Sequence, residues 1–279
     1  MTGISLHIGL NRVDPRHYDG WNGALGACEF DANDMEALAK TRGFTPTKLL
    51  TNAATAQAIT AAISDAAAQL ESGDTFFVTY SGHGGQVPDR NGEDESDHSD
   101  ETWLAYDRQI VDDELYALWG KFKPGVRVMV LSDSCHSGSV TKDIDAAVPN
   151  PVATREAAAE VSPPYRAMPR DVMVATYRAH EKLYDGIQSA VPTARKAEID
   201  ATVVLISGCQ DDQLSLDGFS NGLFTENLRA VWDDGAWKGG HRAFWEAIRS
   251  RMPATQQPNY YVVGAPNDSF EQSDPFTIN

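Results

Sequence analysis

The feature that most constrains the fold is an alternation of apolar, strand-like segments with helix-like segments along the 279 residues. Runs such as ISLHIGL, TFFVTY and VRVMVL are apolar over most of their length, as strands buried on both faces are. Strands separated by helices are typical of a mostly parallel sheet covered on both faces. The sequence therefore predicts an α/β fold.

The expected elements follow one another along the chain. We expect strands at 4–10, 47–51, 74–82, 126–134, 201–208 and 259–265. We expect helices at 24–43, 55–73, 111–122, 222–234 and 241–252. These elements are expected to form one domain, residues 1–279, since a single α/β domain of this size is ordinary.

Two segments depart from the alternation. Residues 89–101 are almost continuously polar and acidic, so we expect a loop there. Residues 139–200 form a long, proline-containing insertion with helix-capable pieces at 152–161 and 171–188. A connection of that length within a domain is usually functional or mobile.

The charge and the cysteine content limit which partners and which cell compartment we expect for the protein. The 23 Lys and Arg against 40 Asp and Glu give a formal net charge of −17, which disfavours nucleic acids and anionic membranes as partners. The N-terminus lacks the pattern of a signal peptide, and no apolar run approaches the ~18 residues of a membrane span. Three widely spaced cysteines argue against a disulfide framework or structural zinc. We expect a cytoplasmic protein.

Two predicted strand ends carry reactive side chains among glycines, where α/β sheets bind their ligands. TFFVTY leads into SGHGG, which contains His83, and VRVMVL leads into DSCHSG, which contains Cys135. A cysteine nucleophile reacts as its thiolate and needs a nearby base, so these two residues are a candidate catalytic pair. The alternatives are a satisfied loop histidine and a buried, inert thiol. His136 adds no metal site, since adjacent residues of an extended segment point opposite ways and no Cys/His cluster accompanies it.

With these motifs the sequence resembles the metacaspases, including their bacterial relatives, the orthocaspases. The resemblance rests on LGACEFDANDMEALAKTRGF, TYSGHGGQ, DDEL, LSDSCHSGS and ISGCQDDQLSLDGFSNGLFT. These stretches span roughly residues 4–232 in family order and leave the insertion at 139–200 unmatched. His83 lies 52 residues before Cys135, near the ~50-residue offset found in caspases. The resemblance implies a caspase-like three-layer sandwich with a mostly parallel central sheet flanked by helices.

The resemblance also implies a cysteine endopeptidase with a Cys-His dyad and no organic cofactor. Cys135 would attack the peptide carbonyl, and His83 would move the proton and protonate the leaving amine. Backbone N–H groups of Cys135 and Gly84 would hold the oxyanion. Proteins or peptides would be the substrates, and the enzyme would be a monomer.

An acidic first pocket is a further implication of the resemblance. It places Asp31 and Asp133 in that pocket, with Cys28 and Ser81 beside them. Two carboxylates in a partly desolvated pocket would select Arg or Lys before the cut bond, Arg most readily through bidentate contact. For Asp31, helix capping or a surface position is the alternative.

Calcium is the one metal that the resemblance suggests. Asp112 and Asp113 of DDEL match calcium-binding positions in some metacaspases, with Asp97 as a third ligand. Asp143 would be the fourth, although it lies one residue off the family spacing. Hard oxygen ligands suit calcium, but acids in the first turn of a helix also have a purely structural explanation.

The insertion suggests how activity is controlled. It carries several basic residues, among them Arg155, Arg166, Arg170, Arg178, Lys182, Arg195 and Lys196. An enzyme with an acidic pocket could cut this segment itself, or an activating protease could do so. We hypothesise that the insertion covers the groove until cleavage or calcium releases it. Two other interpretations remain: a catalytically silent scaffold or calcium-responsive binding module, and a related cysteine peptidase of different specificity.

Overall fold

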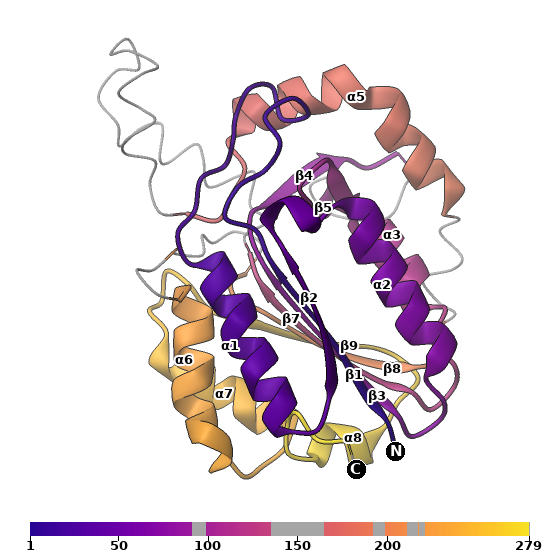
Figure 1. The fold of residues 1–279 in the computed structure, drawn as a ribbon, viewed down its shortest axis with the longest axis vertical. Helices are drawn as coiled ribbons and strands as arrows, with labels where there is room; N and C mark the ends of the chain where they lie inside the picture. Colours follow the sequence, from indigo (N-terminus) through magenta and orange to yellow (C-terminus); the bar gives the residue numbers. More distant parts are fainter. Residues whose placement is uncertain (91–98, 135–164, 192–198, 211–216, 218–220, 279) are drawn as a thin grey trace.

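A six-stranded sheet forms the centre of the protein in the computed structural model, in the order β2-β1-β3-β7-β8-β9 (Figure 1). Its strands are β1 (Gly3–Gly9), β2 (Thr45–Leu50), β3 (Thr75–Ser81), β7 (Arg127–Asp133), β8 (Thr202–Ser207) and β9 (Asn259–Gly264). All neighbours are parallel except β9, which is antiparallel to β8. The structure describes residues 1–90, 99–134, 165–191, 199–210, 217 and 221–278.

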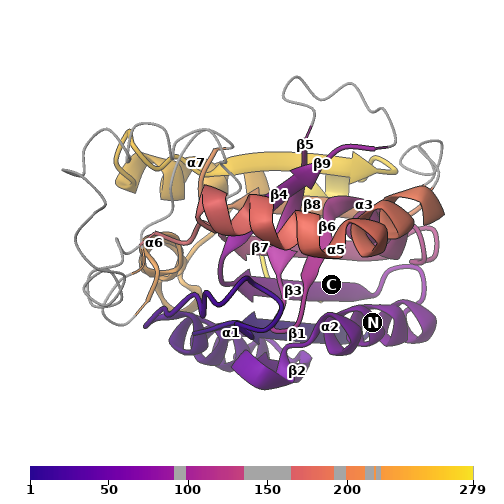
Figure 2. The ribbon, with the colours of Figure 1, turned by 90° about the horizontal axis from the view of Figure 1, so that it is seen from above.

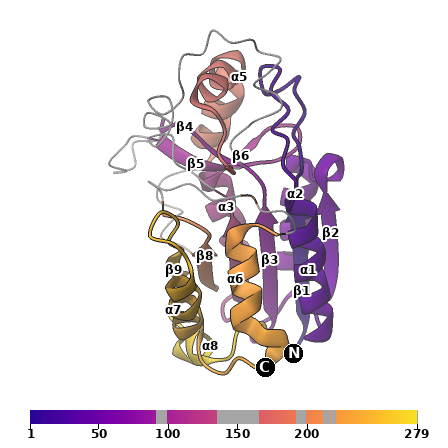
Figure 3. The same ribbon diagram turned by 90° about the vertical axis from the view of Figure 1, so that its left-hand side faces the viewer.

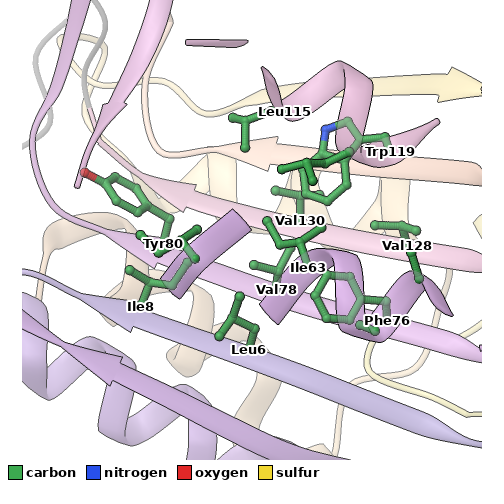
Figure 4. Close-up of a cluster of buried hydrophobic side chains, with 14 of the residues drawn as sticks. Leu6, Ile8, Ile63, Phe76, Val78, Tyr80, Leu115, Trp119, Val128 and Val130 are labelled. Atoms are coloured by element: carbon green, nitrogen blue, oxygen red, sulfur yellow. The ribbon is translucent and has the colours of Figure 1, made fainter. Parts of the chain in front are cut away.

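Helices cover both faces of this sheet. One face packs against α2 (Ala56–Gln69) and α3 (Asp112–Trp119). The other packs against α1 (Cys28–Thr41), α6 (Leu223–Trp232) and α7 (His241–Arg251). Figure 4 shows the first layer, where Ile63 of α2 and Trp119 of α3 point toward Val78 of β3 and Val130 of β7. Every residue of β3 and β7 is buried, which explains their apolar sequences.

A second, smaller sheet lies beyond the carboxyl ends of the central strands. It contains β4 (Gly84–Pro88), β5 (Ser99–Leu104) and β6 (Gln109–Val111), paired antiparallel. Across it lies the 21-residue helix α5 (Arg170–Ala190) (Figures 2 and 3). The remaining short elements are η1 (Thr51–Ala53), η3 (Asp233–Gly235) and α8 (Asp268–Gln272).

The caspase-like α/β architecture expected from the sequence is confirmed, with each expected strand and helix of the central layer present within a few residues. The helix expected at 171–188 is α5, and the piece at 152–161 lies outside the described residues. The prediction of a loop at 89–101 is wrong at its end, because residues 99–101 belong to β5. Asp100 and Thr102 are buried in this strand. A strand is usually recognised in a sequence by apolar residues at its buried positions, and here those positions are polar.

The strand register brings the two catalytic motifs to one edge. Ser81 at the end of β3 pairs with Asp133 at the end of β7. His83 and Cys135 each follow that pair by two residues in the sequence. Both chain termini lie at the opposite end of the molecule (Figure 1). Within the described part of the chain, no helix is both long and apolar enough to cross a bilayer.

Candidate active site

His83 occupies a nearly closed position just beyond β3, with an exposed fraction of 4%. Its Nε2 lies 3.0 Å from the carbonyl oxygen of Gly23. Because a carbonyl only accepts, this contact assigns the proton to Nε2 in the neutral ring. Nδ1 then carries the lone pair, and among the described residues it has no hydrogen-bond partner. The imidazole is therefore arranged to take a proton at Nδ1.

The surroundings keep this imidazole neutral. Burial lowers the pKa of His83 from 6.5 to about 4, and the Arg166 charge acts in the same direction. The Gly23 carbonyl and the Asp217 charge oppose this shift without cancelling it. At neutral pH the ring is a base rather than a cation.

Cys135, the expected nucleophile and second oxyanion donor, lies outside the described residues, as does His136. Ser134, which directly follows β7 and precedes Cys135, is fully buried. The Ser134 carbonyl accepts a hydrogen bond from the Cys209 thiol at 3.2 Å. Cys28 and Cys209 are both buried free thiols. Cys209 thus helps to hold the segment that leads into Cys135.

Arg166, from the insertion, fills the pocket that the sequence predicts to be acidic. Its guanidinium is fully buried and forms ion pairs with Asp31 at 2.7 Å and with Asp133 at 3.0 Å. Nη1 also donates to Ser81 Oγ at 2.9 Å. The structure therefore brings three of the four expected pocket residues into direct contact with one arginine.

A third carboxylate, Asp217, completes the pocket and was not expected from the sequence. It pairs with Arg166 Nη2 at 3.0 Å and lies 3.3 Å from Nε, the nitrogen along the stem of the side chain. Its other oxygen accepts from the Gly26 N–H at 2.8 Å. Asp211 and Asp212, in the same stretch of sequence, lie outside the described residues. Asp217 is recognised as a pocket residue only from its contacts with Arg166 in the structure.

The pocket acids are held in place by donors of their own. Asp31 accepts from Ser81 Oγ at 2.7 Å and from Asn221 Nδ2 at 2.9 Å. Asp133 accepts from the Thr225 hydroxyl at 2.9 Å. Gly222 forms part of the wall, where a Cβ atom would overlap Asp133 and Arg166. A guanidinium thus meets carboxylates whose positions are already fixed.

Burial has opposite consequences for the acids and the base in this pocket. It raises the pKa of Asp31, and the Arg166 charge opposes that rise. It would by itself lower the pKa of Arg166, but the Asp133, Asp31 and Asp217 charges raise it well above its ordinary value. Burial also raises the pKa of the Cys28 thiol to about 12, so Cys28 lines the pocket as a neutral group. The pocket without a cation would hold three close acids, which strongly favours a cationic occupant.

The backbone around Arg166 docks as a short strand. The Gly84 N–H, the expected oxyanion donor, donates to the Arg166 carbonyl at 3.0 Å. The Met168 N–H in turn donates to the Gly84 carbonyl at 2.8 Å, and Ala167 pairs in parallel with Gly84. The carbonyl carbon of Arg166, at the bond to Ala167, therefore lies beside Gly84, the residue that directly follows His83 in the acid/base motif. This is how a peptide substrate would lie with its bond ready to be cut.

The expected calcium ligands are only partly described. Asp113, at the start of α3, is buried, and its N–H donates to Asp112 Oδ1 at 2.8 Å. Asp100 on β5 is a further buried acid, absent from the expected set. Asp97 and Asp143 lie outside the described residues. Among the described residues, no three acidic, histidine or cysteine side chains are arranged to hold a metal ion.

Comparison with known families agrees with this geometry. A family model described as the caspase domain matches residues 13–269. Metacaspase-1 of Mycosarcoma maydis is 30% identical over 257 residues, which cover 79% of this chain and 59% of that protein. Metacaspase-4 of Arabidopsis thaliana is 32% identical over 150 residues, covering 50% of this chain and 34% of that protein. The chain thus spans between a third and three fifths of these two relatives.

Solved structures extend the similarity to the whole chain. Protein GSU0716 from Geobacter sulfurreducens has a TM-score of 0.88 and 49% sequence identity, with 100% of both chains covered. Caspase-1 from Spodoptera frugiperda has a TM-score of 0.55 at 11% identity and covers 94% of this chain and 86% of its own. At that identity the second likeness concerns the fold alone.

Proposed function

The chain belongs to the caspase-domain family of cysteine peptidases as a metacaspase-like member, and from this premise we propose that it is an endopeptidase cutting after arginine. Lysine is the weaker alternative at the same position. A reducing, cytoplasmic location is part of the proposal, because the nucleophile has to remain a free thiol. Protein or peptide chains with an exposed arginine are the proposed substrates.

The observation that carries the proposal is the seating of Arg166. A fully buried guanidinium meets three carboxylates from three separate parts of the chain, Asp31, Asp133 and Asp217. Its two terminal nitrogens and Nε all contact acceptors, an arrangement that suits a planar fork better than the compact ammonium of lysine. An aspartate side chain in the same place would face three like charges. We therefore propose arginine as the preferred residue before the cut bond.

The proposed reaction uses His83 Nδ1 as base and then as acid. Nδ1 takes the proton of the Cys135 thiol as the sulfur attacks the arginine carbonyl carbon, and the Gly84 N–H stabilises the resulting oxyanion. When the carbon–nitrogen bond breaks, His83 returns the proton to the leaving amine and a thioester remains. Water, deprotonated by His83, then hydrolyses the thioester and regenerates the thiol.

We further propose that Arg166 is the first substrate. Its side chain fills the pocket and its carbonyl accepts from Gly84 as a substrate carbonyl would. While it stays there, no other arginine can enter. Cutting between Arg166 and Ala167 would free the segment on its amino-terminal side, whereas the carboxyl-terminal side stays anchored by the fully buried Met168 and by α5.

Fluorogenic peptides ending in arginine, lysine or aspartate test the specificity, with Cys135→Ala as the inactive control. We expect the order arginine, lysine, aspartate, with no measurable turnover of the last. Mass spectrometry of the incubated protein tests the self-cleavage, with a new N-terminus expected at Ala167. Preferred cutting after aspartate would overturn the assignment of the pocket. An intact chain with full activity would overturn the role of Arg166.

Activation by calcium is a separate proposal. It draws its support from the acids at the start of α3, Asp112 and Asp113, together with the buried Asp100. Hard carboxylate ligands suit calcium, but the reaction proposed above needs no metal. Cleavage of Arg166–Ala167 by an activating protease is the alternative to self-cleavage. It is the expected route if purified wild-type protein, incubated alone with and without calcium, keeps this bond intact.

A further inference from the structure

The loop between β1 and α1 covers the catalytic histidine. In Figure 1 this loop, residues 10–27, rises beside α5 at the end of the molecule where the site lies. Its Gly23 carbonyl accepts from His83 Nε2, as described above. Its Trp21 ring packs on the imidazole, with the ring centroids 4.7 Å apart and the planes inclined by 60°. His83 is thus contacted by a polar atom and by an aromatic surface of one loop.

Trp21 is itself held in place by buried neighbours. The backbone N–H of Trp21 donates to the Tyr18 carbonyl at 2.9 Å. Tyr18 is fully buried, and its hydroxyl donates to the Ala105 carbonyl at 2.7 Å. The half-buried Trp21 packs against the cluster that Tyr18 forms with Val13, Leu104, Met168 and Met173. The indole therefore keeps one position over His83 rather than lying freely on the surface.

Gly23 shows how closely these groups are packed. Its φ of +54° lies in the left-handed region, which favours glycine. A Cβ atom at this position would lie 2.9 Å from the Trp21 ring and 3.1 Å from His83 Cδ2. A larger residue would therefore push the indole and the imidazole apart or displace the carbonyl that orients Nε2.

We infer that Trp21 is a positioning residue for His83, which fixes the imidazole on the Gly23 carbonyl and shields it from water so that Nδ1 faces the substrate groove. This inference rests on the proposed function, since it assigns His83 its part in peptide hydrolysis. The lowered pKa of His83 agrees with it, because burial is the largest cause of that shift. The charged groups that act on His83 are Arg166 and Asp217, and the Gly23 and Ala167 backbones also contact the ring.

Histidine titration by NMR tests the inference without relying on turnover. The measurement uses the full chain with Cys135→Ala, so that the segment around Arg166 stays intact, and His83→Gln assigns the signal. We expect an Nε2–H tautomer and a pKa of about 4 before substitution. Trp21→Ala should move that pKa toward 6.5 by roughly 1 unit, because water then reaches the ring. Trp21→Phe, which keeps an aromatic cover, should restore most of the shift.

The active enzyme gives a second readout. With an arginine peptide, Trp21→Ala should lower kcat by about 10-fold with little change in KM, and move the acid limb of kcat/KM to higher pH. Gly23→Ala should act in the same direction, because it displaces the same two rings. An unchanged His83 pKa and tautomer in a folded Trp21→Ala protein would overturn the inference. If the Cys135→Ala protein shows the expected titration but the wild-type protein cuts no arginine peptide, the proposed function is overturned and the positioning role is left intact.

Discussion

The molecule gathers carboxylates in two places, and the two places differ in what neutralises them. In the pocket, Asp31, Asp133 and Asp217 surround a buried arginine supplied by the same chain. At the start of α3, Asp112 accepts from the Asp113 N–H, and the described residues contain no three-ligand arrangement for a metal. In the sequence the second group is the obvious cluster, whereas the pocket acids lie far apart. A binding site is therefore identified by acids that converge on one partner, and not by how closely acids follow one another along the chain.

The largest effect is expected from removing one pocket charge. Asp133→Asn or Asp31→Asn removes one of the carboxylates that a bound guanidinium contacts, and the loss of one partner from a buried ion pair costs about 2–5 kcal/mol of binding. We expect kcat/KM for arginine peptides to fall by about 30- to 5000-fold. Glu36→Gln is the matched control, since Glu36 lies on α1 with Asp31 but pairs with Lys48 at 2.7 Å. Equal losses in control and pocket variants would remove the distinction between this pocket and other acids.

The next effect concerns the occupant of the pocket. Arg166 competes with substrate from within the chain, where tethering gives effective concentrations in the mM range. Arg166→Ala should abolish the new terminus at Ala167 and raise the initial rate on arginine peptides by about 10-fold or more, with no lag. Arg170→Ala removes an exposed arginine of the same segment and serves as control. A lag that survives in Arg166→Ala would mean that something other than this side chain closes the pocket.

The sequence predicts most of the fold and about half of the site, and the division has a physical reason. Buried parallel strands such as β3 and β7 are apolar throughout, so hydrophobicity alone marks them. Strand β5 cannot be recognised by hydrophobicity, because the polar residues Asp100 and Thr102 occupy buried positions in it. His83 is marked by its place after a strand among glycines. In contrast, Asp217 and Trp21 act through contacts across the chain, which no local pattern records.

The pH dependence of protein stability tests whether the pocket acids are coupled to Arg166. In a Cys135→Ala background, Arg166→Ala leaves Asp31 without the charge that lowers its pKa, so that pKa, already raised by burial, rises further. A carboxyl with a raised folded-state pKa loses stability as pH rises through that pKa. Arg166→Ala should therefore melt about 5–10 °C below its parent at pH 7, and the gap should narrow by a few degrees at pH 5. A gap that is constant between these pH values would show that the pocket acids are not coupled to Arg166.

The smallest effect decides what the second group of acids does. If Asp113 binds calcium with a Kd of about 0.1 mM, then 1 mM calcium stabilises the folded protein by ~1.4 kcal/mol and raises its melting temperature by about 3 °C. Asp113→Asn should abolish that rise, whereas magnesium at the same concentration should not produce it. If these acids only favour the N-terminus of α3, calcium should leave the melting temperature unchanged. Asp112→Asn should then cost about 1 kcal/mol with or without calcium, the usual worth of a helix-terminal acid. In that case carboxylates that adjoin in sequence would serve their own helix, and only those that meet across the chain would bind a ligand.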